Sequence, residues 1–348
     1  DLAAIAHNIR ALKALLPAGT RLLAAVKANA YGHGAVEVAR TALASGAGYL
    51  GVARPAEGIA LRQAGIRAPI LVFGYSPPEL SEELAAHELE QCVYDIDTAR
   101  AISARLAGIG QWLPIHLKVD TGMGRLGLPC PDESAATGCV AIARQLSGLP
   151  GIHLKGLFSH FATADSRDKA FAEGQFRRFE ACRAALEANH LRPPLCHMAN
   201  SGAIIDLPAT HLEMVRAGIS VYGLYPSGEV QKERLALQAA LSLKARVIHV
   251  KTIPAGTPIS YGCTWKASRD ATIATVPIGY ADGYSRGLSN KGMMVVGGQR
   301  VPIVGRVCMD LTMLDVSAVP GVKIGDEVVM IGRQGEATVS ADDVAAWN

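Results

Sequence analysis

The chain has 348 residues, of which 49% are hydrophobic and 19% are charged, and its formal net charge is +3. This composition excludes a disordered or collagen-like chain. The charges are nearly balanced and no basic stripe is interleaved with aromatic residues, so we expect no nucleic-acid partner. No run of about 18 apolar residues is present, so we expect no membrane-spanning segment. The length is sufficient for about two domains.

The seven cysteines lie far apart along the chain and form no C-x-x-C pair. They are Cys92, Cys130, Cys139, Cys182, Cys196, Cys263 and Cys308. An odd number of scattered cysteines argues against a disulfide framework and against a structural zinc site. We therefore expect no metal site and a location in the reducing cytoplasm.

Between Arg21 and Tyr222, eight short apolar runs alternate with amphipathic, helical stretches. The predicted strands are Leu22–Lys27, Tyr49–Ala53, Ile70–Gly74, Gln91–Tyr94, Ile115–Asp120, Leu154–His160, Leu195–Asn200 and Glu213–Arg216. The clearest predicted helices are Ala35–Ser45, Pro55–Ala64, Asp97–Ala107 and Lys169–Asn189. Strands that alternate with helices are typical of parallel sheets, and eight such units predict an α/β fold of the (β/α)8 TIM-like barrel type. An open, doubly wound sheet is the alternative.

After about Leu224 the sequence becomes rich in Val, Ile and Thr and is interrupted by turn residues. The predicted strands here are Leu241–Thr252, Ala271–Gly279, Met293–Val296, Val301–Val307 and Glu327–Ile331. This pattern indicates a mainly β domain. The polar segment Ser227–Arg234 is the expected boundary, which gives domains 1–226 and 227–348.

Polar side chains that can do chemistry follow the predicted barrel strands at their carboxyl ends. They are Lys27, Lys118, Asp120, His160, His197, Asn200, Ser201 and Arg216. The loops at this end of a (β/α)8 barrel form the active site in essentially every enzyme of this fold. The sequence therefore predicts that these side chains share one active site.

Lys27 follows a run of apolar residues, Leu22–Val26, with no carboxylate nearby in the sequence. Burial at such a place lowers the pKa of a lysine toward that of a nucleophilic free amine. Such a lysine can bind carbonyl compounds covalently, among them pyridoxal 5'-phosphate (PLP). The alternative is a lysine whose charged end reaches out of the barrel mouth, but Tyr31 and the glycines around His33 favour the first interpretation.

The segment Ala25–Gly34 closely resembles the PLP-lysine signature of the alanine racemase family. Further segments similar to that family follow in the family's order: Leu117–Gly127, His197–Ser201, Met214–Ile219, Ile259–Gly262, Gly279–Tyr284 and Gly305–Asp310. The resemblance covers nearly the whole chain and implies a (β/α)8 barrel followed by a C-terminal β domain. It also implies a cytoplasmic, PLP-dependent racemase that interconverts L- and D-alanine and supplies D-alanine for cell-wall peptidoglycan.

The resemblance also implies a role for individual residues. Lys27 would hold PLP and exchange a proton at one face of the substrate Cα, and Tyr261 would serve the opposite face. PLP contacts are implied for Tyr31, His160, Asn200, Ser201, Arg216, Gly218 and Ile219, substrate carboxylate contacts for Arg125 and Met309, and supporting roles for Lys118, His197, Tyr280 and Asp310. In this family the tyrosine reaches the partner subunit's barrel, so a homodimer with shared active sites is expected.

Two features depart from the family pattern. Leu311 follows Asp310 where the family commonly has Gln, and the sequence stops at Asn348, before a segment that carries another active-site tyrosine in the family. We therefore expect the β domain to be truncated at its C-terminal end. Some family members carry a carbamylated lysine at the position of Lys118, for which a simple contact with Asp120 is the alternative. A serine or broader-specificity racemase, a PLP-dependent decarboxylase of the same fold and a non-catalytic PLP carrier are the other candidate functions.

Overall fold

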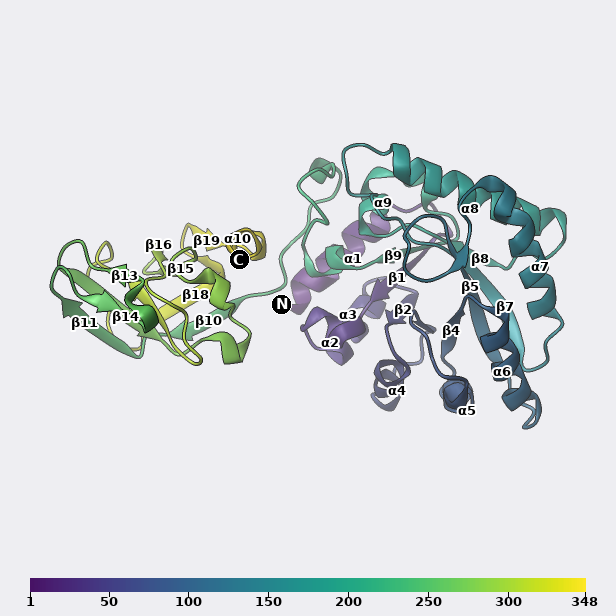
Figure 1. Cartoon of the computed structure of the whole chain (residues 1–348), viewed down its shortest axis with the longest axis horizontal. Helices are drawn as coiled ribbons and strands as arrows, with labels where there is room; N and C mark the ends of the chain where they lie inside the picture. Colours follow the sequence, from purple (N-terminus) through teal and green to yellow (C-terminus); the bar gives the residue numbers. More distant parts are fainter. The chain divides into compact units, whose positions relative to one another are not determined.

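The computed structural model describes all residues from Asp1 to Asn348 and divides the chain into two compact units, Asp1–Ala240 and Leu241–Asn348 (Figure 1). The first unit extends beyond the polar segment Ser227–Arg234, at which the sequence placed the boundary. The Ser227 hydroxyl donates to the Asp165 carbonyl, and the Asn8 side chain exchanges two hydrogen bonds of 2.8 Å with the Gln238 backbone. Residues 227–240 therefore pack on the first unit, and Val230, Leu235 and Ala240 are buried in its core.

The first unit is built on eight parallel strands, so the predicted barrel is confirmed and the open doubly wound sheet is wrong. The strands are β1 (Arg21–Ala25), β2 (Tyr49–Val52), β3 (Ile70–Val72), β4 (Glu90–Val93), β5 (Leu113–Asp120), β7 (Ile152–Phe158), β8 (Leu195–His197) and β9 (Met214–Ala217). They pair in the order β8-β7-β5-β4-β3-β2-β1-β9, and the short β6 (Leu128–Pro129) pairs with β5. The Arg216 N–H donates to the Ala199 carbonyl at 2.9 Å, which joins β9 to the segment after β8 and nearly closes the ring.

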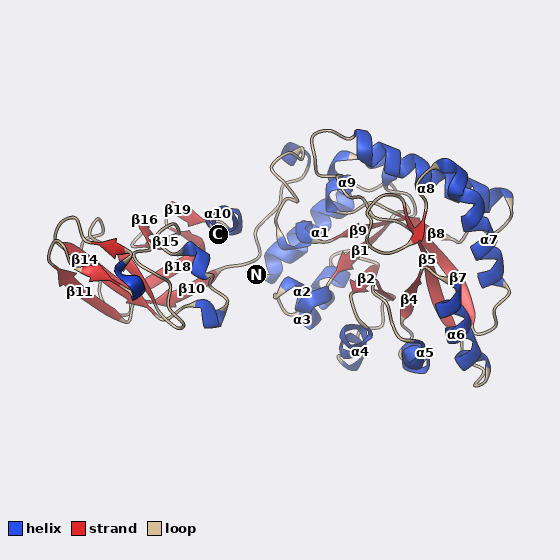
Figure 2. Cartoon of the chain, in the orientation of Figure 1, coloured by secondary structure: helices blue, strands red, loops and turns tan.

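Helices surround these strands (Figure 2). They are α1 (Leu2–Ala14), α3 (Ala35–Ala44), α4 (Pro55–Gln63), α5 (Ser81–Ala86), α6 (Ile96–Ala107), α7 (Ala136–Ser147), α8 (Ala170–Ala188) and α9 (Ser201–Asp206). The four helices predicted most clearly from the sequence are α3, α4, α6 and α8. The strands are buried by the helices on one side and by each other on the inside, which explains their nearly continuous apolar sequences. The helices of this structure are too short or too polar to cross a membrane.

The second unit consists of antiparallel sheets. One contains β10 (Leu243–Arg246), β15 (Met293–Val296), β16 (Gln299–Pro302), β18 (Glu327–Gln334) and β19 (Ala337–Val339), and another contains β11 (His249–Ile253), β14 (Ala271–Val276) and β17 (Thr312–Asp315). The strands β12 (Pro258–Ile259) and β13 (Trp265–Lys266) form a separate ribbon, and α10 (Ala341–Trp347) ends the chain.

The sequence prediction of one strand over Leu241–Thr252 is wrong. The chain breaks at Val247, which is 1% exposed and whose N–H donates to the Asp326 carbonyl, so the two halves of the predicted strand enter different sheets. The apolar pattern was correct, but it could not show where a single buried residue turns the strand.

Candidate active site

A cavity of about 270 Å³ lies at the carboxyl ends of the barrel strands. Its lining includes Lys27, Tyr31, Lys118, Arg125, His160, Asn200, Ser201, Arg216, Gly218 and Ile219. All of them were singled out from the sequence. Segments that are almost 200 residues apart in the chain therefore meet at one place because the parallel strands end on the same side of the barrel.

Lys27 does not end the first strand, as the sequence predicted, but opens a short helical turn, α2 (Lys27–Tyr31), after β1 has ended at Ala25. The four residues from Ala28 to Tyr31 have φ angles of 52° to 55°, so the turn is left-handed. For residues other than glycine this conformation costs roughly 1–2 kcal/mol each. Such strain is retained only where the surrounding structure enforces it, and it is typical of functional sites.

Neighbouring side chains hold the left-handed turn in place. The Glu57 carboxylate accepts hydrogen bonds of 2.7 Å from the N–H groups of Ala28 and Ala53, and the Asn29 side chain accepts one of 2.9 Å from the Ala35 N–H. Glu57 was missed from the sequence, although it stands three residues after Arg54, at a position typical of helix capping. As a result, Lys27 and Tyr31 face the same cavity.

The Lys27 amine has no ion-pair partner. Burial lowers its pKa, and the charge of Arg125 lowers it further, with a smaller contribution of the same sign from Arg216, while Glu57 acts in the opposite direction. A larger share of this lysine is therefore a neutral, nucleophilic amine than of a solvated lysine. This agrees with the chemistry expected from its sequence context.

Hydrogen-bond donors converge at one end of the cavity. The Ser201 hydroxyl accepts bonds from the N–H groups of Gly218, at 3.0 Å, and Ser220, at 3.4 Å. A Cβ atom at Gly218 would lie 2.9 Å from the Tyr31 hydroxyl, so only glycine leaves this space free. Desolvation raises the pKa of Tyr31, so its hydroxyl stays protonated and can donate a hydrogen bond. Such a set of hydroxyl and backbone N–H groups is suited to an anion.

Arg216 is held from several sides within the barrel, where it is 5% exposed. Its Nη1 lies 2.8 Å from His197 Nδ1, and its Nη2 donates to the Ser159 carbonyl at 2.7 Å and lies 3.1 Å from His160 Nδ1. Burial lowers the pKa of Arg216 to about 9, which leaves the guanidinium charged at neutral pH. His197 does not line the cavity but lies directly behind Arg216.

Lys118 forms no ion pair with Asp120, although the charge of Asp120 is one of those that act on the pKa of Lys118. Burial lowers the pKa of Lys118, whose ammonium lies 5.5 Å from the centre of the Phe158 ring. Asp120 instead accepts the backbone N–H groups of residues 122, 123 and 124 at 2.8 to 3.1 Å and so shapes the loop that carries Arg125. Lys118 and Arg125, together with Lys27 and Arg216, make the cavity cationic.

Four of the predicted site residues belong to the second unit. Tyr261, Tyr280 and Met309 are 71%, 45% and 54% exposed, and Asp310 is also exposed. Their turns adjoin each other, because the Tyr280 N–H donates to the Cys308 carbonyl at 3.1 Å and the Ser260 hydroxyl donates to the Arg306 carbonyl at 2.7 Å. Ser260, directly before Tyr261, has a φ of 65° and a ψ of −179°, a strained conformation for a residue other than glycine.

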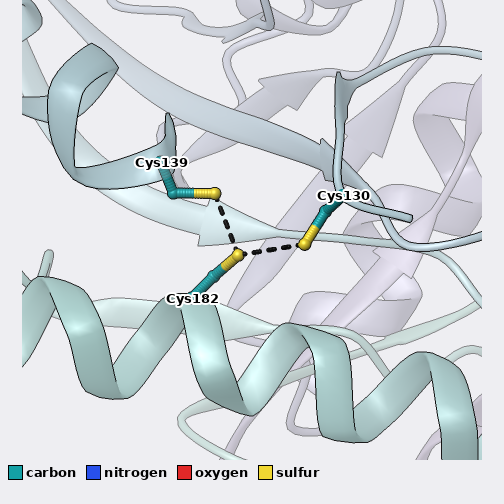
Figure 3. A group of neighbouring side chains, drawn as sticks. All are labelled: Cys130, Cys139 and Cys182. Carbon is teal, nitrogen blue, oxygen red and sulfur yellow. Dashed lines mark hydrogen bonds between the residues drawn. The ribbon is translucent and has the colours of Figure 1, made fainter. Parts of the chain in front are cut away.

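Three of the cysteines that the sequence places far apart meet between helices α7 and α8, which corrects the view of them as scattered (Figure 3). The sulfur of Cys182 lies 2.9 Å from that of Cys139 and 3.3 Å from that of Cys130. All three are buried free thiols. Separation along the chain is a poor measure of distance in a barrel, because each helix packs against the next.

The fold and the cavity define a two-domain enzyme with an eight-stranded parallel barrel, a cationic active site at its carboxyl end and an antiparallel β domain. Residues 1–226 match the family model described as "Alanine racemase, N-terminal domain", and residues 240–348 match "Alanine racemase, C-terminal domain". The chain therefore belongs to the alanine racemase family of isomerases.

Individual relatives agree over nearly the whole chain. The alanine racemase of Desulfosudis oleivorans is 50% identical, over 99% of this chain and 89% of the relative. A solved structure of the Clostridium difficile 630 alanine racemase superposes with a TM-score of 0.91 at 39% identity, covering 99% of this chain and 88% of the other. A histidine racemase from Leuconostoc mesenteroides has a TM-score of 0.88 at 30% identity, covering 99% of this chain and 90% of the other.

Proposed function

We propose that this protein is a PLP-dependent racemase that interconverts L- and D-alanine, acting in the cytoplasm to supply D-alanine for the cell wall. The observation that carries this proposal is the cavity itself. It combines a lysine of lowered pKa, a set of donors for an anion and a buried arginine, all on strand ends of one barrel. PLP has a matching group for each of them: an aldehyde for the lysine, a phosphate for the donors and a ring nitrogen for the arginine.

The residues around the cavity fit PLP. Lys27 would hold its aldehyde carbon, and Tyr31, Ser201, Gly218 and Ile219 would hold its phosphate in the space that the missing Cβ of Gly218 leaves. When bound, PLP withdraws electrons from the substrate Cα and so acidifies the proton there. His160 and Asn200 would lie against the cofactor.

Arg216 would face the ring nitrogen of the cofactor. A guanidinium donates hydrogen bonds but cannot accept one, so a proton on that ring nitrogen would have no partner. Arg216 would therefore leave that ring nitrogen unprotonated and keep the electron withdrawal from Cα weaker than a carboxylate at the same place would. This favours return of the proton to Cα over transfer of the amino group.

Racemisation requires that a proton leave one face of Cα and another reach the opposite face. The Lys27 amine would serve one face, and the Tyr261 hydroxyl the other. Tyr261 lies with Tyr280 and Met309 on an exposed, partly apolar face of the second unit, which is a feature of surfaces that pair with another chain. We propose that Tyr261 reaches the barrel of the partner subunit in a homodimer.

The substrate carboxylate would bind to Arg125 and to the backbone N–H of Met309, with Lys118, Tyr280 and Asp310 in support. The cavity of about 270 Å³ is the part of the site that one barrel provides. The partner's Tyr280 would narrow its entrance, which favours a small substrate side chain. Serine remains the second candidate, because it adds only a hydroxyl to alanine, and the histidine racemase shows that a similar fold serves another amino acid.

The proposal is tested by incubating the PLP-loaded protein with L-alanine, L-serine and L-histidine and separating the enantiomers on a chiral column. We expect alanine to reach equal amounts of both enantiomers, with serine slower and histidine unchanged. Release of carbon dioxide would indicate a decarboxylase, and PLP binding without any turnover would indicate a carrier.

The position of the cofactor is tested by borohydride reduction, digestion and mass spectrometry. The pyridoxyl group should be found on Lys27, and the Lys27→Ala variant should lose it. A label on Lys118 or another lysine would refute the assignment.

A further inference from the structure

A chain of hydrogen bonds crosses the inside of the barrel, from Arg216 in the active-site cavity to Glu90 outside its lining. Arg216 Nη1 lies 2.8 Å from His197 Nδ1, His197 Nε2 lies 2.9 Å from His116 Nδ1, and His116 Nε2 lies 2.9 Å from Glu90 Oε2. The four side chains come from β9, β8, β5 and β4, and none is more than 5% exposed. Neither Glu90 nor His116 lines the active-site cavity.

We call the chain Arg216–His197–His116–Glu90 the relay. The positions of its protons can be assigned by starting from the arginine. A guanidinium can only donate, so His197 Nδ1 must accept and the ring proton of His197 is on Nε2. That proton is donated to His116 Nδ1, so the proton of His116 is also on Nε2 and is donated to Glu90. Both imidazoles are then neutral, and each of their four ring nitrogens has one partner. Burial lowers the pKa of both His116 and His197, in agreement with two neutral rings.

Glu90 supplies the negative charge at the far end. Burial alone would raise its pKa, but the hydrogen bonds from His116 and Lys155 outweigh this, and its pKa is lowered. The Tyr49 hydroxyl, 3.0 Å from each carboxylate oxygen, completes its surroundings. Glu90 is thus ionised inside the barrel.

The backbone is shaped to admit the His116 ring. A Cβ atom at Gly156, on the neighbouring strand β7, would lie 2.0 Å from His116 Nδ1, so no other residue fits there without displacing the ring. The register between β5 and β7 shifts at the same point, between Ile115 and His116. His197 is fixed by stacking on Phe158, with ring centres 4.9 Å apart and an angle of 4°.

Arg216 needs such a connection because its other charged neighbours are unfavourable. Lys118 and Arg125, and Lys27 when it is protonated, are cations near the same cavity, and Asp165, the one carboxylate in its lining, forms no ion pair with Arg216. The remaining titratable groups near it are His160, His197 and the buried Cys92 thiol. A buried charge without a counter-charge is costly, and hydrogen bonds in a chain polarise one another in a low-dielectric interior.

We propose that Glu90 and His116 are positioning residues for Arg216: through the two neutral imidazoles they fix the plane of the guanidinium and keep it charged. This deepens the proposed function, since it rests on Arg216 facing the cofactor. Through the relay, the protonation state of the cofactor's ring nitrogen would depend on Glu90, a carboxylate on the opposite side of the barrel.

The first test does not depend on activity. The full-length chain is labelled with ¹⁵N-histidine, and the tautomers are read from the imidazole nitrogen shifts between pH 6 and 9, with and without PLP. We expect His116 and His197 as neutral rings protonated on Nε2. A charged ring, or a proton on Nδ1 of either residue, would overturn the relay, whereas a failure to racemise alanine would leave this result standing.

The second test measures function with Glu90→Gln, which keeps the shape and the bond to His116 but removes the charge. We expect kcat for alanine to fall roughly tenfold with KM nearly unchanged, the size expected when a supporting contact is lost. The alkaline limit of the pH profile should move to lower pH by roughly half a unit to one unit, because Arg216 loses its proton more readily.

Two further variants separate a positioning role of Glu90 and His116 from a purely structural one. Gly156→Ala, which displaces His116, should reproduce the Glu90→Gln shift of the pH profile. Tyr49→Phe removes a different bond to Glu90 but leaves the relay intact, so it should lower stability without moving the profile. A profile unchanged in both Glu90→Gln and Gly156→Ala, or shifted equally by Tyr49→Phe, would refute the positioning role.

Discussion

Lys27 and Arg216 face the same cavity, yet only Arg216 is surrounded by hydrogen-bond acceptors. The carbonyls of Ser159, His197 and Met198 lie within 3.1 Å of its guanidinium nitrogens. Lys27 has no such partner, and burial lowers its pKa. One residue is thus held as a fixed cation, while the other remains available as an amine. This difference depends on contacts, and the sequence could identify the two residues but not these contacts.

The role of Arg216 predicts a change in the reaction outcome. Arg216→Glu supplies an acceptor that favours a protonated cofactor ring, so electron withdrawal from Cα becomes stronger. We expect slower racemisation and more transamination, measured as pyruvate formed from alanine. Arg216→Lys, which keeps a cation, should slow racemisation without raising pyruvate. Loss of racemisation in Arg216→Glu with no rise in pyruvate would count against this role.

At the scale of single elements, the turn α2 shows what the sequence could not predict. The motif identified Lys27 and Tyr31, but of the four left-handed residues only Asn29 is of a type that favours this conformation, so the sequence does not predict a left-handed turn. The hand of the turn is enforced by tertiary contacts, above all by Glu57, which is 29 residues further along the chain than Ala28. A local pattern carries no information about such a distant partner.

The strain in α2 predicts opposite effects of the same substitution at two exposed alanines. Ala28→Gly relieves a left-handed conformation and should raise the free energy of unfolding by roughly 0.5 kcal/mol, after the entropy cost of glycine is included. Ala101→Gly, in the middle of α6, should lower it by about 1 kcal/mol. Urea unfolding measures both values. Equal destabilisation by the two variants would show that the turn is not strained.

The histidines of strands β5 and β8 predict a loss of stability in acid. His116 and His197 have lowered pKa values in the folded state, whereas in the unfolded chain they titrate near 6.5. The unfolded state therefore binds more protons below pH 6.5, so the stability present above that pH is lost as the pH falls. Each residue contributes a slope of up to about 1.4 kcal/mol per pH unit.

This prediction is checked by urea unfolding at pH 7.5, 6.5 and 5.5. Below pH 6.5, His116→Gln should reduce the slope of the unfolding free energy against pH by up to about 1.4 kcal/mol per pH unit, which corresponds to one proton. Replacement of the exposed His249 by Gln should leave this slope unchanged. The same slope in wild type and His116→Gln would mean that His116 is charged in the folded protein.

For the whole molecule, strand count and barrel type followed from the alternation of apolar runs and helical patterns, because each βα unit is a local repeat. The end of the first unit at Ala240 and the meeting of Cys130, Cys139 and Cys182 did not, because both depend on packing between distant segments. Of the relay from Arg216 to Glu90, the sequence identified Arg216 and His197 but not His116 and Glu90. His116 stands between apolar residues of its strand, and Glu90 directly precedes the strand predicted from Gln91, so neither has a distinguishing sequence signal.

In the proposed homodimer, each active site would be built from two chains, with Lys27 from one and Tyr261 from the other. Lys27→Ala and Tyr261→Phe remove the two groups without adding bulk, so both variants should still assemble. Each should be inactive alone. In a mixed dimer, one site would carry both changes and the other would carry none.

The measurement is therefore the alanine racemase activity of a mixture of the two inactive variants after subunit exchange. Random exchange makes about half of the dimers mixed, and half of their sites are intact, so about one-quarter of the wild-type activity should return. If both groups belonged to the same chain, every site would keep one defect. A mixture in which affinity tags demonstrate exchange but which remains inactive would contradict the shared site.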